Sequence, residues 1–214
     1  MRFWFDFISP YAYLAWKQAP AFCEARGLEF DPQPVLFAAL LNHWGQLGPA
    51  EVPPKRVYTY KHCVRRASRA GIPFTYPPAH PFNPLLALRC AFLPLEPQRK
   101  HLLIDALFDA TWGGKGGIDE PGRVAAVLER AGFDADSLIA QSADADHKIA
   151  FREHNEAAVG AGVFGVPTFD LEGEMFWGSD VFEDLAERLE GRDPVASLDL
   201  EALLSLPVGA HRRG

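Results

Sequence analysis

A serine followed by a proline, Ser9-Pro10, stands where a strand pattern gives way to a helical one. Phe3, Phe5 and Phe7 alternate before it, as in a half-buried strand, and a proline suits the first turn of a helix. Such a serine commonly caps the helix. As a nucleophile it would need a base, and the sequence offers neither a G-x-S-x-G elbow nor a nearby histidine.

A third role for Ser9 is to hold an anion. A hydroxyl at the amino terminus of a helix can donate a hydrogen bond to an anion that the helix dipole already favours. If that anion were the thiolate of a bound thiol cofactor, the pKa of the thiol would fall from about 8.5 toward neutrality, as it does for protein cysteines at such positions. Ser9 is therefore the candidate catalytic residue.

A second candidate is the pair Val166-Pro167 in GVFGVPTF, which comes directly before a strand pattern. We expect the main-chain N–H and C=O groups of Val166 to be unpaired, so that a peptide-like ligand can bind to them as an added strand. The alternative is a tight turn before an edge strand. Because only about 5–6% of X–Pro bonds are cis, the sequence alone leaves the isomer of this bond open.

The composition excludes several classes of function. The chain has 214 residues, of which 48% are hydrophobic, enough to bury a full core. A formal net charge of −7 argues against a nucleic-acid binder, because phosphate backbones require a basic surface. No apolar run is long enough to span a bilayer. We therefore expect neither a nucleic-acid partner nor a membrane.

The cysteines and histidines show no pattern of a metal or redox site. Cys23, Cys63 and Cys90 are far apart and form no C-x-x-C, so we expect each to pack as a small buried apolar residue. An odd number of cysteines without a secretory signal fits a cytoplasmic protein. The seven histidines show neither H-x-x-x-H nor H-E-x-x-H spacing, so we expect no metal.

The elements that would position these residues lie at the two ends of the chain. A strand over residues 2–8, a helix over 10–27 with a kink at Pro20, and a second strand within 28–37 that two prolines interrupt give a β-α-β unit. Near the other end, residues 168–171 and 174–177 predict a hairpin followed by a last amphipathic helix.

The segment between these ends shows helical signals and almost no strand signals. Pro84, Pro97 and Pro121 each mark the first turn of a predicted helix. The organisation predicts an α/β fold, a thioredoxin-like domain with an all-helical insertion domain. We expect residues 1–37 and 161–214 to form the discontinuous thioredoxin-like domain and residues 38–160 to form the insertion. In such a fold the X-Pro pair before the third strand is cis and faces the first helix.

Five motifs occur here in the same order as in a known family: FDFISPYAYLAW, GPAEVPPKRVYT, HPFNPLLALR, GVFGVPTF and FWGSD. The chain resembles the 2-hydroxychromene-2-carboxylate isomerase family over about residues 2–190. That family is similar to the kappa-class glutathione transferases and belongs to the thioredoxin-like disulfide-oxidoreductase branch.

The resemblance implies a glutathione site. Ser9 matches the serine that holds the glutathione sulfur, and Val166 matches the residue before a cis-proline, here Pro167, whose main chain pairs with the glutathione cysteine. Lys55, in PPKRVY, matches a lysine near the glycine end of glutathione, where a cation is needed. Without the alignment of these motifs with the family, Lys55 would be interpreted as an ordinary solvated lysine on a helix.

The resemblance implies that the WGSD motif binds the γ-glutamyl end of glutathione. Ser179 and Asp180 match the pair that binds it: a hydroxyl at a helix amino terminus suits the α-carboxylate, and Asp180 suits the α-ammonium group. The chain departs from the family at WGQ, where relatives often have TGN, so Gln46 inherits the role of that asparagine.

Five residues are candidates for the substrate pocket. Asn42 and Trp44 replace commoner residues and could reshape it, and Tyr11 would suit an aryl ring or, alternatively, pack in the core. Asn83, in FNP where many relatives have Asn-Thr, is either a substrate contact or only a helix cap. Arg89 could meet a substrate carboxylate or form a structural salt bridge.

The activity that the resemblance implies is the glutathione-dependent isomerisation of 2-hydroxychromene-2-carboxylate and trans-o-hydroxybenzylidenepyruvate, as in the degradation of naphthalene-type compounds. The thiolate adds reversibly to a conjugated double bond, which rotates once it is single. The enzyme binds glutathione, lowers the pKa of its thiol and orients a small aromatic substrate. Relatives suggest a homodimer.

Three alternatives stay open. A kappa-like glutathione transferase or peroxidase would use the same thiolate on another electrophile, and nothing in the sequence separates it from the isomerase. A thiol-disulfide oxidoreductase needs a cysteine at position 9 or 12, where the chain has Ser9 and Ala12, unless another cysteine is recruited. A non-enzymatic glutathione- or peptide-binding module would bind glutathione without lowering the pKa of its thiol.

Overall fold

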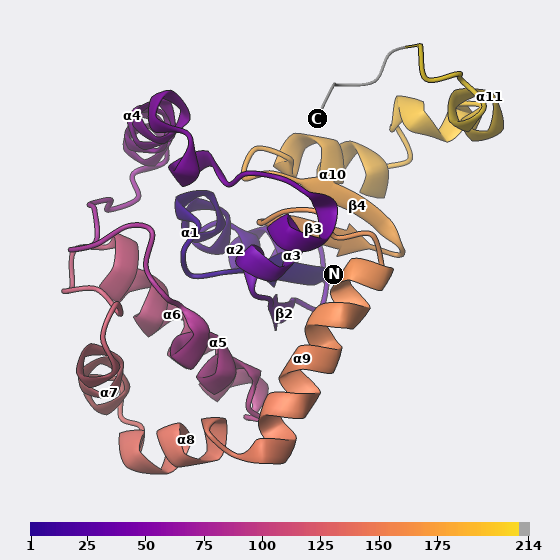
Figure 1. Ribbon diagram of the computed structural model, residues 1–214. Helices are drawn as coiled ribbons and strands as arrows, with labels where there is room; N and C mark the ends of the chain where they lie inside the picture. The colour runs from indigo at the N-terminus through magenta and orange to yellow at the C-terminus, as the bar shows by residue number, and fades with distance from the viewer. Residues whose placement is uncertain (210–214) are drawn as a thin grey trace. The chain divides into compact units, whose positions relative to one another are not determined.

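Four strands form one mixed sheet within residues 1–209, the part of the chain that the computed structural model describes (Figure 1). The strands are β1 (Arg2–Phe5), β2 (Asp31–Pro34), β3 (Thr168–Leu171) and β4 (Glu174–Trp177), in the order β2-β1-β3-β4. β1 pairs in parallel with β2 and antiparallel with β3, which pairs antiparallel with β4. The described chain divides into two compact units, Met1–Val181 and the residues from Phe182 onward.

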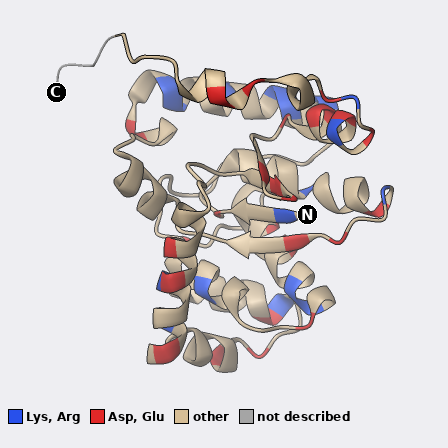
Figure 2. Cartoon of the chain, turned by 90° about the vertical axis from the view of Figure 1, so that its right-hand side faces the viewer, with Lys and Arg blue, Asp and Glu red and all other residues tan. Residues whose placement is uncertain are grey.

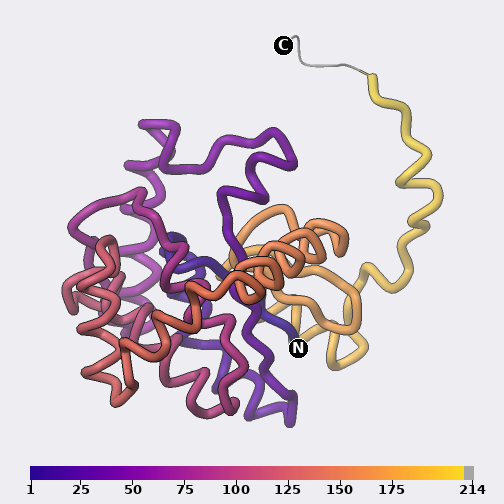
Figure 3. The backbone as a smooth tube through the Cα atoms, turned by 60° about the horizontal axis from the view of Figure 1, so that its bottom comes forward, coloured from indigo at the N-terminus to yellow at the C-terminus, as the bar shows by residue number. Residues whose placement is uncertain are grey.

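The first unit holds the sheet and most of the helices. After β1 come α1 (Pro10–Trp16) and α2 (Ala19–Glu24). Between β2 and β3 the described chain is helical: α3 (Phe37–Trp44), η1 (Pro49–Glu51), α4 (Pro53–Ala70), α5 (Leu85–Phe92), α6 (Pro97–Trp112), α7 (Pro121–Arg130), α8 (Ala135–Ser142) and α9 (Ala145–Gly160). Figure 3 lets this path be followed from β1 in indigo, through the helices, to the orange hairpin.

These elements confirm the predicted α/β fold with helices inserted between the two halves of a thioredoxin-like sheet. The hairpin strands have the predicted bounds, and α6 and α7 begin at the predicted prolines. The division into domains at residues 37/38 and 160/161 stays a prediction. The second unit contains α10 (Phe182–Leu189), η2 (Pro194–Ser197) and α11 (Leu200–Leu204).

The second strand runs through two prolines rather than being interrupted by them. β2 lies at the edge of the sheet, where Pro32 and Pro34 stand opposite Phe3 and Phe5 of β1. Asp31, just before the first proline, donates its N–H to the carbonyl oxygen of Met1, the residue before β1. Because residues alternate along a strand, the two prolines occupy the positions whose missing N–H would face away from the sheet, which is where an edge strand tolerates proline.

The first predicted helix is two helices. The chain leaves the helical path after Trp16 and starts again at Ala19, with Pro20 in the first turn of α2. A proline inside a continuous helix would remove one backbone hydrogen bond and clash with the preceding turn, so the break places Pro20 where its ring is tolerated. The short α1 is almost completely buried.

An aromatic core fixes β1 against the helices. Phe3, Phe5 and Phe7 are fully buried, and Phe5 and Phe7 both contact Phe108 of α6. Burying an aromatic side chain of this size stabilises the fold by about 1.5–3 kcal/mol. The strand that leads to Ser9 is therefore anchored over its whole length.

Basic and acidic residues are interspersed along the helices and loops of the chain (Figure 2). α4 is unusual, because its eighteen residues include lysines and arginines but no acidic residue. Within residues 1–209 no helix is both long and apolar enough to cross a bilayer. No group of three or more histidine, cysteine or acidic side chains in the same range could hold a metal ion.

Candidate functional site

Ser9 occupies the N-cap position of α1. Its Oγ accepts a hydrogen bond from the Ala12 N–H at 3.2 Å and donates one to the Val166 carbonyl oxygen at 3.4 Å. The first bond is the capping interaction expected of a serine. The second is long for an O–H donor, so the hydroxyl proton is only weakly held and can turn to a better acceptor.

The turn that carries Ser9 is held at successive residues. The Ser9 N–H donates to the Asp6 carbonyl oxygen at 3.1 Å, and the Phe7 carbonyl oxygen accepts from the indole Nε1 of buried Trp112 at 2.8 Å. The Ile8 carbonyl oxygen bonds Nε2 of His80 at 3.0 Å. Because backbone groups of Phe7, Ile8 and Ser9 are all hydrogen-bonded, the backbone that carries the Ser9 side chain has little freedom of position.

Asp6 is a fully buried carboxyl group beneath this turn. It accepts hydrogen bonds from the N–H of Ile8 at 3.0 Å and of Phe37, the first residue of α3, at 2.9 Å. Burial raises the pKa of Asp6 to about 7, although the two backbone hydrogen bonds act in the opposite direction. Asp6 therefore ties the Ser9 turn to α3, and its charge depends on pH near neutrality.

Val166 lies opposite Ser9 and precedes a cis peptide bond to Pro167. The expectation that both main-chain groups of Val166 are unpaired is half wrong, because its carbonyl oxygen accepts from the Ser9 hydroxyl. Its N–H makes no hydrogen bond to any of residues 1–209. A peptide-like ligand can still use this N–H and take over the Ser9 hydroxyl.

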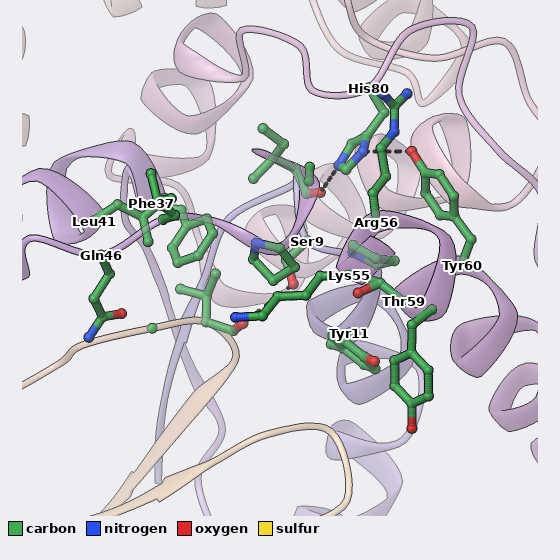
Figure 4. A pocket seen from close by; sticks show the side chains of 18 of the residues that line it. Ser9, Tyr11, Phe37, Leu41, Gln46, Lys55, Arg56, Thr59, Tyr60 and His80 are labelled. Atoms are coloured by element: carbon green, nitrogen blue, oxygen red, sulfur yellow. Dashed lines mark hydrogen bonds between the residues drawn. The ribbon is translucent and has the colours of Figure 1, made fainter. Parts of the chain in front are cut away.

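A pocket of about 480 Å³ opens beside Ser9 and Val166 (Figure 4). Its walls are largely apolar and come from four places in the chain: the Ser9 turn with α1, the α3–α4 segment, the loop that carries His80, and the stretch from Phe164 to Trp177. The predicted residues that line it are Ser9, Tyr11, Gln46, Lys55 and Val166. Figure 4 shows the Lys55 side chain extending from α4 toward Ser9.

The wall near β4 depends on a glycine. Trp177 lines the pocket, and its ring contacts that of Phe164 at a centroid distance of 5.3 Å. A Cβ atom on Gly165 would meet the indole Nε1 of Trp177 at 2.7 Å, closer than real Cβ contacts. The absence of a side chain at this residue therefore allows the indole to lie against the backbone just before Val166.

Ser179 and Asp180 follow Trp177 but do not line the pocket itself. Arg66 of α4 reaches both: its Nη2 donates to the Ser179 carbonyl oxygen at 2.9 Å, and its Nη1 lies 3.3 Å from the Asp180 carboxylate. Ser179 is buried, whereas the Asp180 side chain is largely exposed. The Arg66 guanidinium group thus joins α4 to the two residues that the resemblance assigns to the γ-glutamyl end.

The remaining predicted residues lie outside this pocket. Asn42 is exposed on α3, and Trp44 donates its indole N–H to the Val163 carbonyl oxygen at 3.0 Å. Asn83 lines a second pocket, and its Oδ1 accepts from the Leu85 N–H at 3.0 Å. The predicted helix start is wrong by one residue, because Pro84 is the N-cap of α5 and Leu85 is its first residue. Arg89 makes no ion pair within residues 1–209, and its Nε is buried without a hydrogen-bond partner.

Several pocket residues were not singled out from the sequence. The polar ones are Arg56, Tyr58, Thr59, Tyr60 and His80. Tyr60 and His80 are joined by a hydrogen bond of 2.8 Å between the phenol oxygen and Nδ1. The signal that could have indicated the α4 residues is their spacing: residues 55, 56, 59 and 60 recur at the period of one helical face. His80 lies in a proline-rich loop without periodicity, so no such signal exists for it.

The chain is similar in sequence to known proteins. A family model described as the DSBA-like thioredoxin domain matches residues 1–190. The chain is 28% identical over 192 residues to a protein named 2-hydroxychromene-2-carboxylate isomerase from Sphingobium xenophagum, covering 87% of this chain and 96% of that protein. It is 27% identical over 204 residues to a protein named glutathione S-transferase kappa 2 from Caenorhabditis elegans, covering 88% and 91%.

A solved structure of a 2-hydroxychromene-2-carboxylate isomerase has the same fold. The two chains superpose with a TM-score of 0.80 at 26% sequence identity, and the superposition covers 96% of this chain and 98% of the other. Sequence and structure thus point to the same group of relatives.

Proposed function

The chain belongs to the DSBA-like thioredoxin domain family, and from its relatives and its pocket we propose that it is a glutathione-dependent isomerase. The proposed reaction interconverts 2-hydroxychromene-2-carboxylate and trans-o-hydroxybenzylidenepyruvate. The observation that carries the proposal is the Ser9 hydroxyl: Ser9 lines a mostly apolar pocket at a position where a disulfide oxidoreductase of this fold would need a cysteine.

The residues around the pocket fit glutathione. The Val166 N–H, which is unpaired within residues 1–209, and the neighbouring carbonyl group suit the peptide backbone of the glutathione cysteine. The Lys55 ammonium suits the glycine carboxylate, and Gln46 can donate to the same end. We assign Ser179 and Asp180 to the γ-glutamyl end.

Bound glutathione supplies a thiolate that adds reversibly to a conjugated double bond of the substrate. The part of Ser9 is to donate its hydroxyl proton to that sulfur, which favours the charged form and lowers the pKa of the thiol. The proton is free to do so because its present acceptor, the Val166 carbonyl oxygen, is 3.4 Å away. The largely apolar pocket walls give this hydrogen bond surroundings of low polarity, which strengthens it.

The same pocket suits the substrate. Phe37, Phe164 and Trp177 offer apolar surface for an aryl ring, and Tyr11 of α1 lines the same pocket. Arg56 adds a second cation beside Lys55, so a pyruvate carboxylate and the glycine carboxylate of glutathione can both be neutralised. Asn42, Trp44, Asn83 and Arg89 do not line this pocket, so we assign them no substrate contact.

A kappa-like glutathione transferase or peroxidase is the second candidate, because a relative of similar identity carries the transferase name. Disulfide exchange by the chain's own cysteines is disfavoured. Cys23, Cys63 and Cys90 are all buried, and burial raises the pKa of their thiols to about 11, 12 and 11. A thiol so rarely ionised reacts slowly with disulfides. A homodimer and a cytoplasmic location stay predictions from the resemblance and the free cysteines.

The test has two steps. Isothermal titration of the purified protein with glutathione should show binding, and addition of 2-hydroxychromene-2-carboxylate should then give isomerisation that requires catalytic amounts of glutathione. Isomerisation without consumption of glutathione supports the isomerase. Binding with stoichiometric consumption by other electrophiles, and no isomerisation, supports the transferase instead.

A further inference from the structure

A hydrogen-bonded chain of three groups crosses the pocket wall above Ser9. The Tyr60 phenol bonds Nδ1 of His80 at 2.8 Å, and Nε2 of the same imidazole bonds the Ile8 carbonyl oxygen at 3.0 Å. Tyr60, His80 and Ile8 all line the pocket, and Figure 4 shows both hydrogen bonds. The chain ends on the residue next to Ser9, so it lies beside the place proposed for the thiolate.

The direction of each hydrogen bond follows from the chemistry of its ends. A backbone carbonyl can only accept, so Nε2 of His80 must carry a hydrogen. In a neutral imidazole the other nitrogen, Nδ1, then accepts, and the Tyr60 hydroxyl must be its donor. The Tyr60 oxygen is left with lone pairs that can accept a proton from a pocket-bound molecule, while its own proton can move to Nδ1.

The surroundings keep His80 neutral and therefore able to take up a proton. Burial lowers the pKa of His80, the Arg56 guanidinium lowers it further, and the hydrogen bond to the Ile8 carbonyl acts in the opposite direction. The rings of Trp112 and Phe82 pack against the imidazole at centroid distances of 5.3 and 6.3 Å. Tyr60 and Arg56, both from α4, are the titratable and charged groups that face it within residues 1–209.

A second tyrosine–histidine pair in this region lacks the same anchoring. The Tyr11 hydroxyl lies 2.9 Å from Nδ1 of His62, but Nε2 of His62 bonds no backbone carbonyl within residues 1–209. Its tautomer is not fixed by the fold, and His62 does not line the pocket. A relay with a defined direction is thus formed by Tyr60 and His80 and not by this pair.

We propose that Tyr60 is a catalytic acid–base residue, positioned by His80, which moves the hydroxyl proton of the substrate during ring opening. The inference rests on the proposed function, because the cyclic substrate carries a hydroxyl group and the ring oxygen on one carbon. As the hydroxyl O–H bond breaks, its proton passes to the Tyr60 oxygen and the Tyr60 proton passes to Nδ1 of His80. The hydroxyl oxygen becomes a carbonyl oxygen, and the ring C–O bond breaks with its electron pair left on the phenolate. Tyr60 then protonates the phenolate while His80 returns the proton, so both residues end unchanged.

The experiment compares Tyr60→Phe and His80→Gln with two matched controls. Tyr76→Phe removes a hydroxyl from a ring that packs on Tyr60 at 4.8 Å, and His147→Gln removes an imidazole that bonds a backbone carbonyl, that of Arg89, at 2.9 Å. Neither control residue lines the pocket. We expect kcat for the isomerisation to fall about 100-fold in both relay variants and to be unchanged in both controls. Glutathione affinity and the ultraviolet titration of the bound thiolate should be the same in all four.

A readout without substrate completes the test. Nitrogen NMR of the free protein should show His80 as the Nε2–H tautomer, and Tyr60→Phe should perturb its Nδ1 signal. A wild-type protein that isomerises the substrate while Tyr60→Phe keeps full kcat would overturn the relay and leave the proposed function standing. A wild-type protein without isomerisation would overturn both. An Nδ1–H tautomer would overturn the relay in either case.

Discussion

Replacing Ser9 by alanine tests the role of the hydroxyl quantitatively. Ser9→Ala removes the capping bond to the Ala12 N–H and the donor that we assign to the glutathione sulfur. Loss of an N-cap costs about 0.5–2 kcal/mol of stability. A hydrogen bond to a charged group contributes about 1.5–3 kcal/mol, and one pKa unit corresponds to about 1.36 kcal/mol. The pKa of the bound thiol should therefore rise by about 1–2 units.

The kinetic consequence follows from ionisation. If the pKa of the bound thiol is near 7 in the wild type, the thiolate fraction at pH 7 falls about 5- to 50-fold in the variant. Turnover should fall by the same factor at pH 7 and recover at a pH above the raised pKa, while glutathione binds only modestly more weakly. Ultraviolet titration of the bound thiolate and kcat as a function of pH measure the two effects.

Two further variants separate stability from chemistry. Ser9→Gly also lacks the hydroxyl, but as an N-cap glycine costs only a few tenths of a kcal/mol of stability. The pKa of the bound glutathione thiol should therefore rise as much as in Ser9→Ala, in a protein that is more stable than Ser9→Ala. Asp134→Ala removes the N-cap of α8, where the carboxylate accepts from the Ser137 N–H, and should lower stability alone. If Ser9→Ala kept the wild-type thiol pKa and full turnover at pH 7, the serine would be a helix cap and nothing more.

Three other predictions concern the cation, the buried carboxyl group and the cysteines. Lys55→Gln should raise the Kd of glutathione about 2- to 5-fold in titration calorimetry, as for an exposed ion pair, with no change for glutathione esterified at glycine or for the control Lys61→Gln; an equal loss with the ester would contradict the assignment. The Asp6 pKa is raised from 3.8 to about 7, so the folded state holds a proton that the unfolded state has lost, and the free energy of unfolding should fall as pH rises through this window. Asp6→Asn should remove this pH dependence, whose total over the window is at most about 4 kcal/mol of unfolding free energy, from denaturant titrations. An unchanged pH dependence would assign it to another group. Iodoacetamide at neutral pH should label none of the three cysteines in the native protein and all three after denaturation, as mass spectrometry reports, because burial both covers them and raises the pKa of their thiols; rapid native labelling would reopen the oxidoreductase alternative.

Much of the fold was predictable because its signals are local. A hairpin with Glu172-Gly173 at the turn, helices that begin at prolines and an alternating first strand are encoded in a few neighbouring residues each. The second strand was harder to define, because its prolines argue against a strand and only the position of β2 at the sheet edge makes them acceptable.

The site was predictable in part. Ser9, Val166 and Lys55 were found from motifs, and the structure brings all three to one pocket. The pairing of Tyr60 with His80 and of Arg66 with Asp180 was missed, because both depend on how a helix and a distant loop pack together. No period or motif records such contacts. The backbone carbonyl of Val166 was also expected to be free, since its bond to Ser9 joins residues 157 positions apart.

A crystal structure of the protein with glutathione tests the central claim most directly. We predict that the glutathione sulfur lies within hydrogen-bonding distance of the Ser9 Oγ and that the main chain of its cysteine pairs with Val166. A structure with the sulfur elsewhere, and the Ser9 hydroxyl still bonded to the Val166 carbonyl, would contradict the account.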